Sequence, residues 1–171
     1  LPDACAAETM PFPHAVFVDD AREQLKVACH YARHVAGRVN ALPQRKAKAK
    51  TQGGRLRIGY LSADFHQHAT AQLMVQMLEA HDRSRVEVTL VSAGADDGSA
   101  MRRRLKQACH RFEDLHGHSH DAMARRIRSL GIDILVDVKG ATDGTLLPVL
   151  AARPAPLQLN WLAFPGTSNA T

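Results

Sequence analysis

Cysteine, aromatic residues and long apolar runs are all scarce in this 171-residue sequence. The three cysteines, Cys5, Cys29 and Cys109, lie far apart and form no CxxC pair. This spacing argues against a structural zinc site or a disulfide framework and favours a reducing, cytoplasmic compartment. No apolar run approaches the roughly 20 residues of a membrane-spanning helix. The first residues, LPD, have neither the basic nor the apolar region of a signal peptide, so we expect no membrane partner.

Short catalytic fingerprints are also missing from the sequence. It contains no GxGxxG turn after a strand, no Walker A loop, no GxSxG and no HExxH. These absences argue against classical dinucleotide binding, P-loop chemistry, a nucleophile elbow and a zincin-type metal site. The function has to be sought in loops that carry no single strong motif.

Positive charge is concentrated in two places, although the net charge is only +5. The segments are QRKAKAK (44–50) and MRRRLK (101–106). Such clusters either bind a polyanion or form a solvated linker and a solvated helix face. Because no aromatic residues are interleaved with the basic ones, we favour the second interpretation and expect no nucleic-acid partner.

Residues 18–42 have the periodicity of one amphipathic helix. Asp19 and Asp20 suit its start, and Pro43 would end it. A basic, glycine-containing connector follows at 44–54. The apolar residues recur at spacings of four and three, which places them on one face: Ala21, Leu25, Ala28, Ala32, Val35 and Val39.

From Arg55 onward, apolar strands alternate with helical patterns, which predicts an α/β fold with a parallel sheet covered by helices on both faces. The expected strands are 56–61, 86–91, 132–138 and 156–161, with a weaker one at 112–115. The expected helices are 70–81, 98–109, 119–130 and 144–152. Ligands of such folds bind at the carboxyl ends of the strands. Those ends are the loops 62–68, 92–99, 139–144 and 162–170.

The loop after the first strand holds Asp64, His66 and His68 within SADFHQHATAQLM (62–74). One interpretation is a metal site on His66 and His68, completed by carboxylates from later strand ends. A second is an acid/base pair of Asp64 and His68, and a third is a polar turn. We expect Thr70 to cap the next helix, with Ala71 as its first residue. The positive end of that helix would disfavour an imidazolium nearby and would suit a phosphate.

Other loops allow a structural and a functional interpretation side by side. FPGTSNA (164–170) is either a plain turn or an amide-rich turn that meets a sugar or phosphate. In ADDGS (95–99), Asp97 or Ser99 is expected to cap a helix. The histidines of LHGHSH (115–120) are either weak metal ligands or, as we prefer, exposed loop residues.

Taken together, four segments resemble the O-GlcNAc transferase family in order and approximate spacing. They are RLRIGYLSADFHQHATAQLM, SAGADDGSAMRRRL, LGIDILVDVKGATDG and RPAPLQLNWLAFPGTSNA. The resemblance implies a bacterial enzyme that moves N-acetylglucosamine from UDP-GlcNAc to Ser or Thr of proteins, with inversion and without a metal. It implies a Rossmann-like N-terminal lobe of a GT-B type fold at 55–171, preceded at 1–54 by the end of a TPR-like region. Because the chain lacks an initiator Met and ends abruptly, we expect it to be a piece of a longer protein. The resemblance implies that a second lobe, which holds most of the UDP, lies outside these residues.

The resemblance also implies roles for individual residues. His68 matches the key active-site histidine beside the donor, and Asp64 matches an aspartate proposed to help deprotonate the acceptor. Gln67 stands where the family has a polar active-site residue. The implied sugar and acetamido pocket consists of Met10, Thr70, Leu162, Ala163, Phe164, Pro165 and Gly166.

The sequence also departs from the family pattern. Ala7 stands where animal enzymes have a further histidine, and Ala69 and Gln72 replace a proline and a histidine. Ala163 replaces a common glycine, and Asp143 replaces a lysine near the acceptor path. No lysine is evident at a strand end to stabilise a departing diphosphate. Two alternatives stay open: a non-catalytic α/β module that docks a peptide or polyanion, and a metal hydrolase using His66 and His68.

Overall fold

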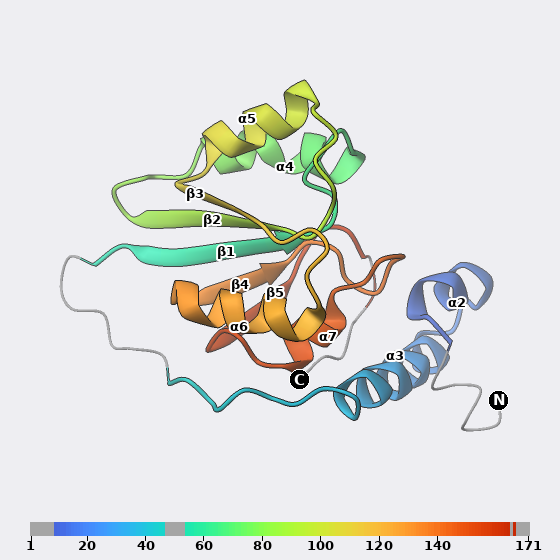
Figure 1. Ribbon diagram of the computed structural model, residues 1–171. Helices are drawn as coiled ribbons and strands as arrows, with labels where there is room; N and C mark the ends of the chain where they lie inside the picture. The colour runs from blue at the N-terminus through green and yellow to red at the C-terminus, as the bar shows by residue number, and fades with distance from the viewer. Residues whose placement is uncertain (1–8, 47–53, 165, 167–171) are drawn as a thin grey trace.

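A computed structural model describes residues 9–46, 54–164 and 166. A parallel five-stranded sheet has helices on both faces, and two further helices lie beside it near the N-terminus (Figure 1). The strands are β1 Leu56–Ser62, β2 Val86–Ser92, β3 Arg111–Asp114, β4 Ile134–Asp137 and β5 Leu157–Asn160. The helices are α2 Pro11–Phe17, α3 Ala21–Ala36, α4 Ala69–Glu79, α5 Ala100–Ala108, α6 His120–Leu130 and α7 Leu147–Ala151. Within the described residues, no helix is both long enough and apolar enough to cross a membrane.

The strand order, β3-β2-β1-β4-β5, determines where a ligand can bind. From β1 the chain first builds outward through β2 and β3, and then returns to place β4 and β5 on the other side. The order therefore reverses between β1 and β4, which pair directly from Ile58↔Ile134 to Leu61↔Asp137. In open parallel sheets, this reversal leaves a crevice at the carboxyl ends of the two strands.

The secondary structure expected from Arg55 onward is confirmed in kind and order. Each expected strand is present, and the weak candidate at 112–115 is an edge strand, β3. The expected helix at 144–152 is the most shortened, because α7 begins only at Leu147. Gly144 adopts a left-handed conformation with φ 69°, which keeps the preceding residues in a turn.

The prediction of one helix over 18–42 is wrong at both ends. Helix α3 begins after Asp20, whose Oδ1 accepts hydrogen bonds from the N–H groups of Arg22 (2.8 Å) and Glu23 (3.3 Å). It ends at Ala36 with Gly37 as its cap, well before Pro43. A separate helix, α2, begins with Pro11, where a proline is tolerated because its first-turn N–H would have no helical partner.

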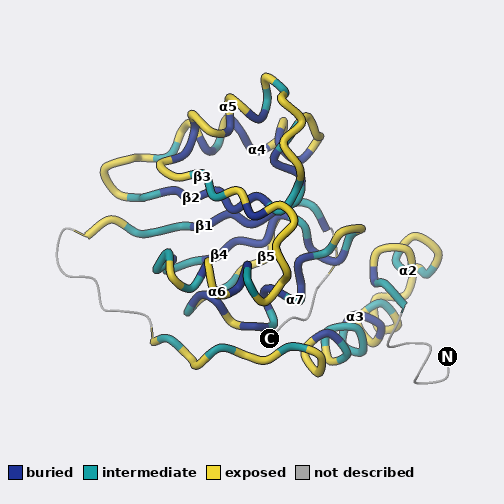
Figure 2. Tube along the Cα trace, in the orientation of Figure 1, coloured by how far each residue is buried: buried dark blue, intermediate teal, exposed yellow. Residues whose placement is uncertain are grey.

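Apolar side chains fill both sides of the sheet. Figure 2 shows that β1, β2 and β4 are buried in large part, whereas the helices that cover them are exposed on their outer sides. One cluster joins α4 and α5 to the sheet and includes Met74, Leu90 and Leu105. The other joins α6 and α7 to the opposite face and includes Leu61 and Ile127. Each fully buried side chain of this size contributes about 1.5–3 kcal/mol.

The N-terminal helices pack on the second cluster. Val35 of α3 is one of its buried members, and Tyr31 and Leu42 pack against it. The segment after α3 is tied to the lobe, because the N–H of Leu42 donates to the carbonyl of Ala152 (2.8 Å). The Arg45 guanidinium donates to the carbonyl of Gly131 (3.1 Å), so the basic connector begins as part of the packed structure.

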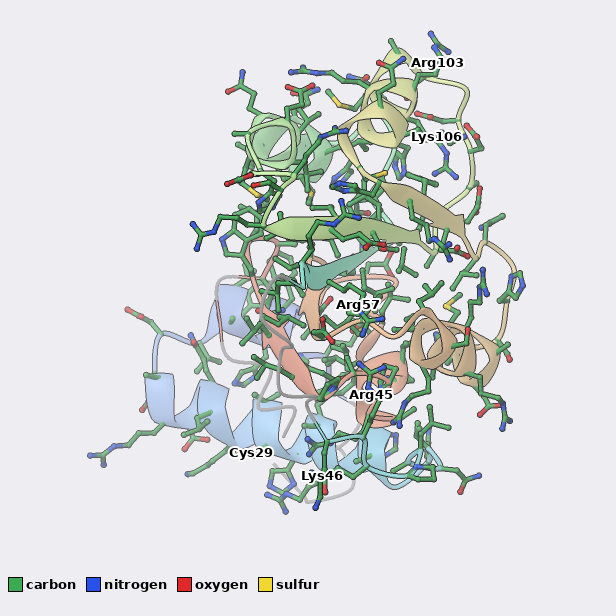
Figure 3. All side chains as sticks on the ribbon, turned by 90° about the vertical axis from the view of Figure 1, so that its left-hand side faces the viewer. Cys29, Arg45, Lys46, Arg57, Arg103 and Lys106 are labelled. Atoms are coloured by element: carbon green, nitrogen blue, oxygen red, sulfur yellow. The ribbon has the colours of Figure 1, made fainter. Side chains whose placement is uncertain are left out.

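The basic side chains of MRRRLK have partners inside the fold. Arg102 is buried, Arg104 pairs with Glu79 at 2.7 Å, and Lys106 pairs with Asp96 at 2.9 Å. Figure 3 shows Arg103 and Lys106 on α5, far from Arg45 and Lys46 on the connector. Arg45 and Lys46 therefore lie on a different surface from α5, whose charges are largely engaged in the protein's own contacts. Lys48 and Lys50 lie outside the described residues.

Candidate functional site

The loops that follow β1 and β4 meet beyond the carboxyl ends of these strands, where the strand order reverses. Asp64 follows β1, and Lys139 follows β4. The Lys139 ammonium donates to both carboxylate oxygens of Asp64, at 2.9 and 3.1 Å. The two side chains are 12% and 8% exposed, so this ion pair is almost fully desolvated.

Lys139 corrects the sequence analysis, which found no lysine at a strand end. It lies two residues beyond the end of β4, in the KGATDG loop. The signal was available, because Lys139 is the first residue of the 139–144 loop, which the sequence places at a strand end. The sequence pattern did not provide the sheet order, which makes β4 the neighbour of β1 and so brings Lys139 to Asp64.

Asp137 supports this loop and was also missed. It is fully buried at the end of β4, and one carboxylate oxygen accepts the N–H of Lys139 at 3.0 Å. The other oxygen accepts the N–H of Gly140 (3.0 Å) and the side-chain amide of Asn160 (3.1 Å). Burial raises the pKa of Asp137, and these donors oppose that rise. Asp137 therefore shapes the turn from which Lys139 extends.

His68 is the N-cap of α4, which corrects the prediction that Thr70 caps this helix. The helix begins at Ala69, and the His68 Nδ1 accepts the N–H of Thr70 at 3.2 Å. A ring nitrogen that accepts a hydrogen bond carries no proton, so the neutral ring has its proton on Nε2. The side chain is 43% exposed, and its Nδ1 is 3.9 Å from Asp64 Oδ2, beyond hydrogen-bonding distance. His68 can therefore offer an N–H to a ligand.

Two other residues of this loop are oriented by different parts of the fold. The N–H of Gln67 donates to Asp97 Oδ2 at 2.9 Å, while Thr70 is buried in the first turn of α4. The helix after ADDGS is capped by Ser99, whose hydroxyl accepts the N–H of Arg102 at 3.1 Å. Of the two expected caps, Ser99 is thus confirmed, whereas Asp97 reaches to the loop that holds Gln67.

The turn after β5 packs against two other segments of the site. Phe164 is buried, and its ring meets that of Phe12 edge-on at 6.4 Å. A Cβ on Gly140 would lie 2.4 Å from the Cβ of Phe164, so only glycine fits there. Leu162 takes a left-handed conformation with φ 79°, and the N–H of Ala163 donates to the Trp161 carbonyl (3.2 Å). These contacts hold the turn beside the loop that carries Lys139.

The remaining residues of the expected sugar pocket lie near the N-terminal helices. Met10 caps α2 and lines a cavity of about 600 Å³ together with Tyr31, His34 and other residues. Gly166 lines a smaller cavity of about 190 Å³ with Phe164, beside α2 and α3. Pro165 lies outside the described residues. The structure therefore brings the segment after Met10 against Phe164, through the ring of Phe12.

The part of the chain that the structure describes offers no third side chain to complete a metal site with His66 and His68. The rings of His66 and His68 face each other edge-on, 5.6 Å apart. No group of three or more His, Cys, Asp or Glu side chains able to hold a metal occurs among the described residues. The other His-rich stretch is exposed, and His116 and His118 have ring nitrogens near backbone carbonyls (3.3 and 3.4 Å).

Comparisons with known proteins identify the family of the chain. The model of the family described as glycosyl transferase family 41 matches residues 11–171. A probable UDP-N-acetylglucosamine–peptide N-acetylglucosaminyltransferase of Arabidopsis thaliana is 34% identical over 169 residues, covering 94% of this chain and 17% of that protein. The corresponding transferase of Caenorhabditis elegans is 42% identical over 120 residues, which cover 70% of this chain and 10% of that protein.

A solved structure also matches. A mutant of the O-GlcNAc transferase of Thermobaculum terrenum superimposes with a TM-score of 0.81 at 29% identity, covering 95% of this chain and 31% of that one. The expected fold, a Rossmann-like α/β lobe of the GT-B type, is confirmed, as is the resemblance to O-GlcNAc transferases. The chain spans a third or less of the length of these relatives.

Proposed function

This chain belongs to glycosyl transferase family 41, and from that premise we propose that it is part of a protein O-GlcNAc transferase. The full-length protein would transfer N-acetylglucosamine from UDP-GlcNAc to Ser or Thr hydroxyls of proteins, with inversion at the anomeric carbon. The observation that carries the proposal is the meeting of Asp64, Lys139 and His68 at the carboxyl ends of β1 and β4. Relatives that bear this activity in their names add to it.

In the proposed reaction, the acceptor hydroxyl oxygen bonds to the anomeric carbon. The bond from that carbon to the diphosphate oxygen breaks, and its electron pair leaves on UDP. His68 donates its Nε2–H to an oxygen of the donor, which stabilises charge that develops during departure. Asp64 takes the hydroxyl proton as the new bond forms.

The remaining site residues are proposed to bind the sugar. Gln67 offers an exposed amide next to His68, and Thr70 and Met10 line the pocket. The turn Leu162, Ala163, Phe164, Pro165 and Gly166 would meet the acetamido group. Most of the UDP would bind to a second lobe of the same protein, and residues 1–54 would end a TPR-like region. The scarcity of cysteine leads us to propose a cytoplasmic enzyme.

Calorimetric titration of UDP and UDP-GlcNAc into the full-length protein, with and without EDTA, tests this proposal. We expect binding that EDTA does not change, because the proposed roles are filled by side chains and no metal takes part. Binding that is lost with EDTA would favour a metal site on His66 and His68. No binding of UDP would favour a docking module.

A further inference from the structure

The loop between β2 and α5, residues 93–99, lies directly against the active-site loop, residues 62–68. The N–H of Ala93 donates to the carbonyl of Ser62 at 2.9 Å. A Cβ built on Gly94 would lie 1.9 Å from the carbonyl oxygen of Ala63. The two loops therefore touch backbone to backbone, with no room for a side chain between them.

Asp97 continues this contact with its side chain. Its Oδ2 accepts the N–H of Gln67 at 2.9 Å, and its Oδ1 accepts the N–H of Ser99 at 3.0 Å. Each carboxylate oxygen thus has a backbone donor on a different loop. The Gln67 N–H is the largest cause that lowers the pKa of Asp97 to about 2, so the carboxylate is ionised at any working pH.

Arg102 holds the same stretch at a second point. The side chain is only 1% exposed, and its Nη1 donates to the carbonyl of Phe65 at 3.1 Å and to Ser92 Oγ at 3.0 Å. The carbonyl of Phe65 and the N–H of Gln67 flank His66. The backbone on both sides of His66 is therefore held by residues of the β2–α5 segment, immediately before His68.

We propose that Asp97 is a positioning residue of the active site. Its carboxylate holds the backbone N–H of Gln67. This contact thereby sets the position in which the side chains of Gln67 and His68 meet the substrate. The proposal rests on the transferase function proposed above. Reacting groups displaced by about 1 Å can cost up to about 100-fold in rate, so a single anchor of this loop matters even though it touches no substrate.

Asp96 provides a matched control on the same loop. It is exposed, like Asp97, and its pKa is also lowered to about 2, in its case chiefly by Lys106. Its own partners are Lys106, the N–H of Gly98 and the Nε of Arg102, and none of them contacts Gln67. Arg102 bonds to the carbonyl of Phe65 through a different nitrogen, Nη1. Replacing Asp96 therefore changes the charge of the β2–α5 loop while leaving the Gln67 contact in place.

The test compares Asp97→Ala, Asp97→Asn and Asp96→Asn in the full-length protein. It measures amide hydrogen exchange at Gln67, kcat, the Kd for UDP and the melting temperature. For Asp97→Ala we expect faster exchange at Gln67 and a kcat about 10-fold lower, with UDP affinity and melting temperature little changed. Asp97→Asn should be intermediate, because one amide oxygen has to serve two N–H donors. Asp96→Asn should match the wild-type exchange and kcat.

Unchanged Gln67 exchange in Asp97→Ala would overturn the proposal, as would an unchanged kcat despite faster exchange. A loss of kcat that only follows a lower melting temperature, and that Asp96→Asn shares, would also overturn it. A wild-type protein that transfers no sugar would overturn the proposed function instead. The exchange at Gln67 would then still decide whether Asp97 holds the loop.

Discussion

At the scale of single residues, the Asp64–Lys139 pair decides how the site is charged. Removing two charges from water is costly, and their attraction offsets that cost only when the geometry is good. Here the ammonium contacts both carboxylate oxygens. If one partner were removed, the other would be left as a nearly buried charge without compensation.

Lys139→Met is therefore expected to lower the free energy of unfolding by about 3 kcal/mol, as for other buried pairs that lose one member. Denaturant unfolding measures this change. Lys139→Met combined with Asp64→Asn should recover most of the loss, because no uncompensated charge remains. Lys106→Met, which breaks the more exposed pair with Asp96, should change stability little. A single Lys139→Met variant as stable as the wild type would contradict the importance of this pair.

Single residues also mark the limit of what the sequence predicts. Asp64 and His68 could be placed in the site because they follow a recognisable strand. Lys139 and Asp137 were missed, since their importance depends on β4 lying next to β1. His68 rather than Thr70 caps the helix, because an imidazole nitrogen can accept a hydrogen bond from a first-turn N–H as a side-chain oxygen does.

At the scale of elements, the 93–99 loop is the support on which the active-site loop rests. The strands and helices around it were predicted well, because apolar strand runs and helical periodicity both persist for several residues in this lobe. The missed helix α2 has the sequence PFPHAVF, in which two prolines argue against a helix except in the first turn. Contacts between loops leave no such pattern in the sequence.

Gly94→Ala is expected to separate the two loops, because its Cβ would overlap the backbone of Ala63. Gly98→Ala is the matched control, since Gly98 has φ 65° but no atom within 4 Å of a built Cβ. In both variants the free energy of unfolding should fall by about 1–2 kcal/mol, in Gly94→Ala through overpacking and in Gly98→Ala through backbone strain. Only Gly94→Ala should lose transfer activity and show faster hydrogen exchange at the backbone amide of Gln67. Equal activity in the two variants would contradict the supporting role of this contact.

At the scale of the whole molecule, the division into residues 1–54 and 55–171 remains a prediction. The packing of Val35, Tyr31 and Leu42 on the cluster that contains Leu61 ties the N-terminal helices to the lobe. Sequence periodicity placed Ala28 and Val35 correctly on the buried face of α3. It was wrong for Ala21 and Leu25, which are exposed, and it missed Val27, which is buried.

A chain truncated to residues 55–171 is therefore expected to be less stable than residues 1–171, by about 3 kcal/mol for the loss of a pair of buried apolar contacts. Urea unfolding of the two chains, followed by circular dichroism, measures the difference. Equal stability would show that the helices and the lobe are independent units, as the boundary at residue 54 implies.

The most direct measurement is transfer of sugar by the full-length protein. Wild type, His68→Ala and His118→Ala would each be incubated with UDP-GlcNAc and an acceptor protein, and the acceptor's mass would be followed. We expect the wild type and His118→Ala, whose histidine is exposed on the loop after β3, to add N-acetylglucosamine equally, and His68→Ala to add none. Full transfer by His68→Ala would remove His68 from the mechanism, and no transfer by the wild type would contradict the proposed function itself.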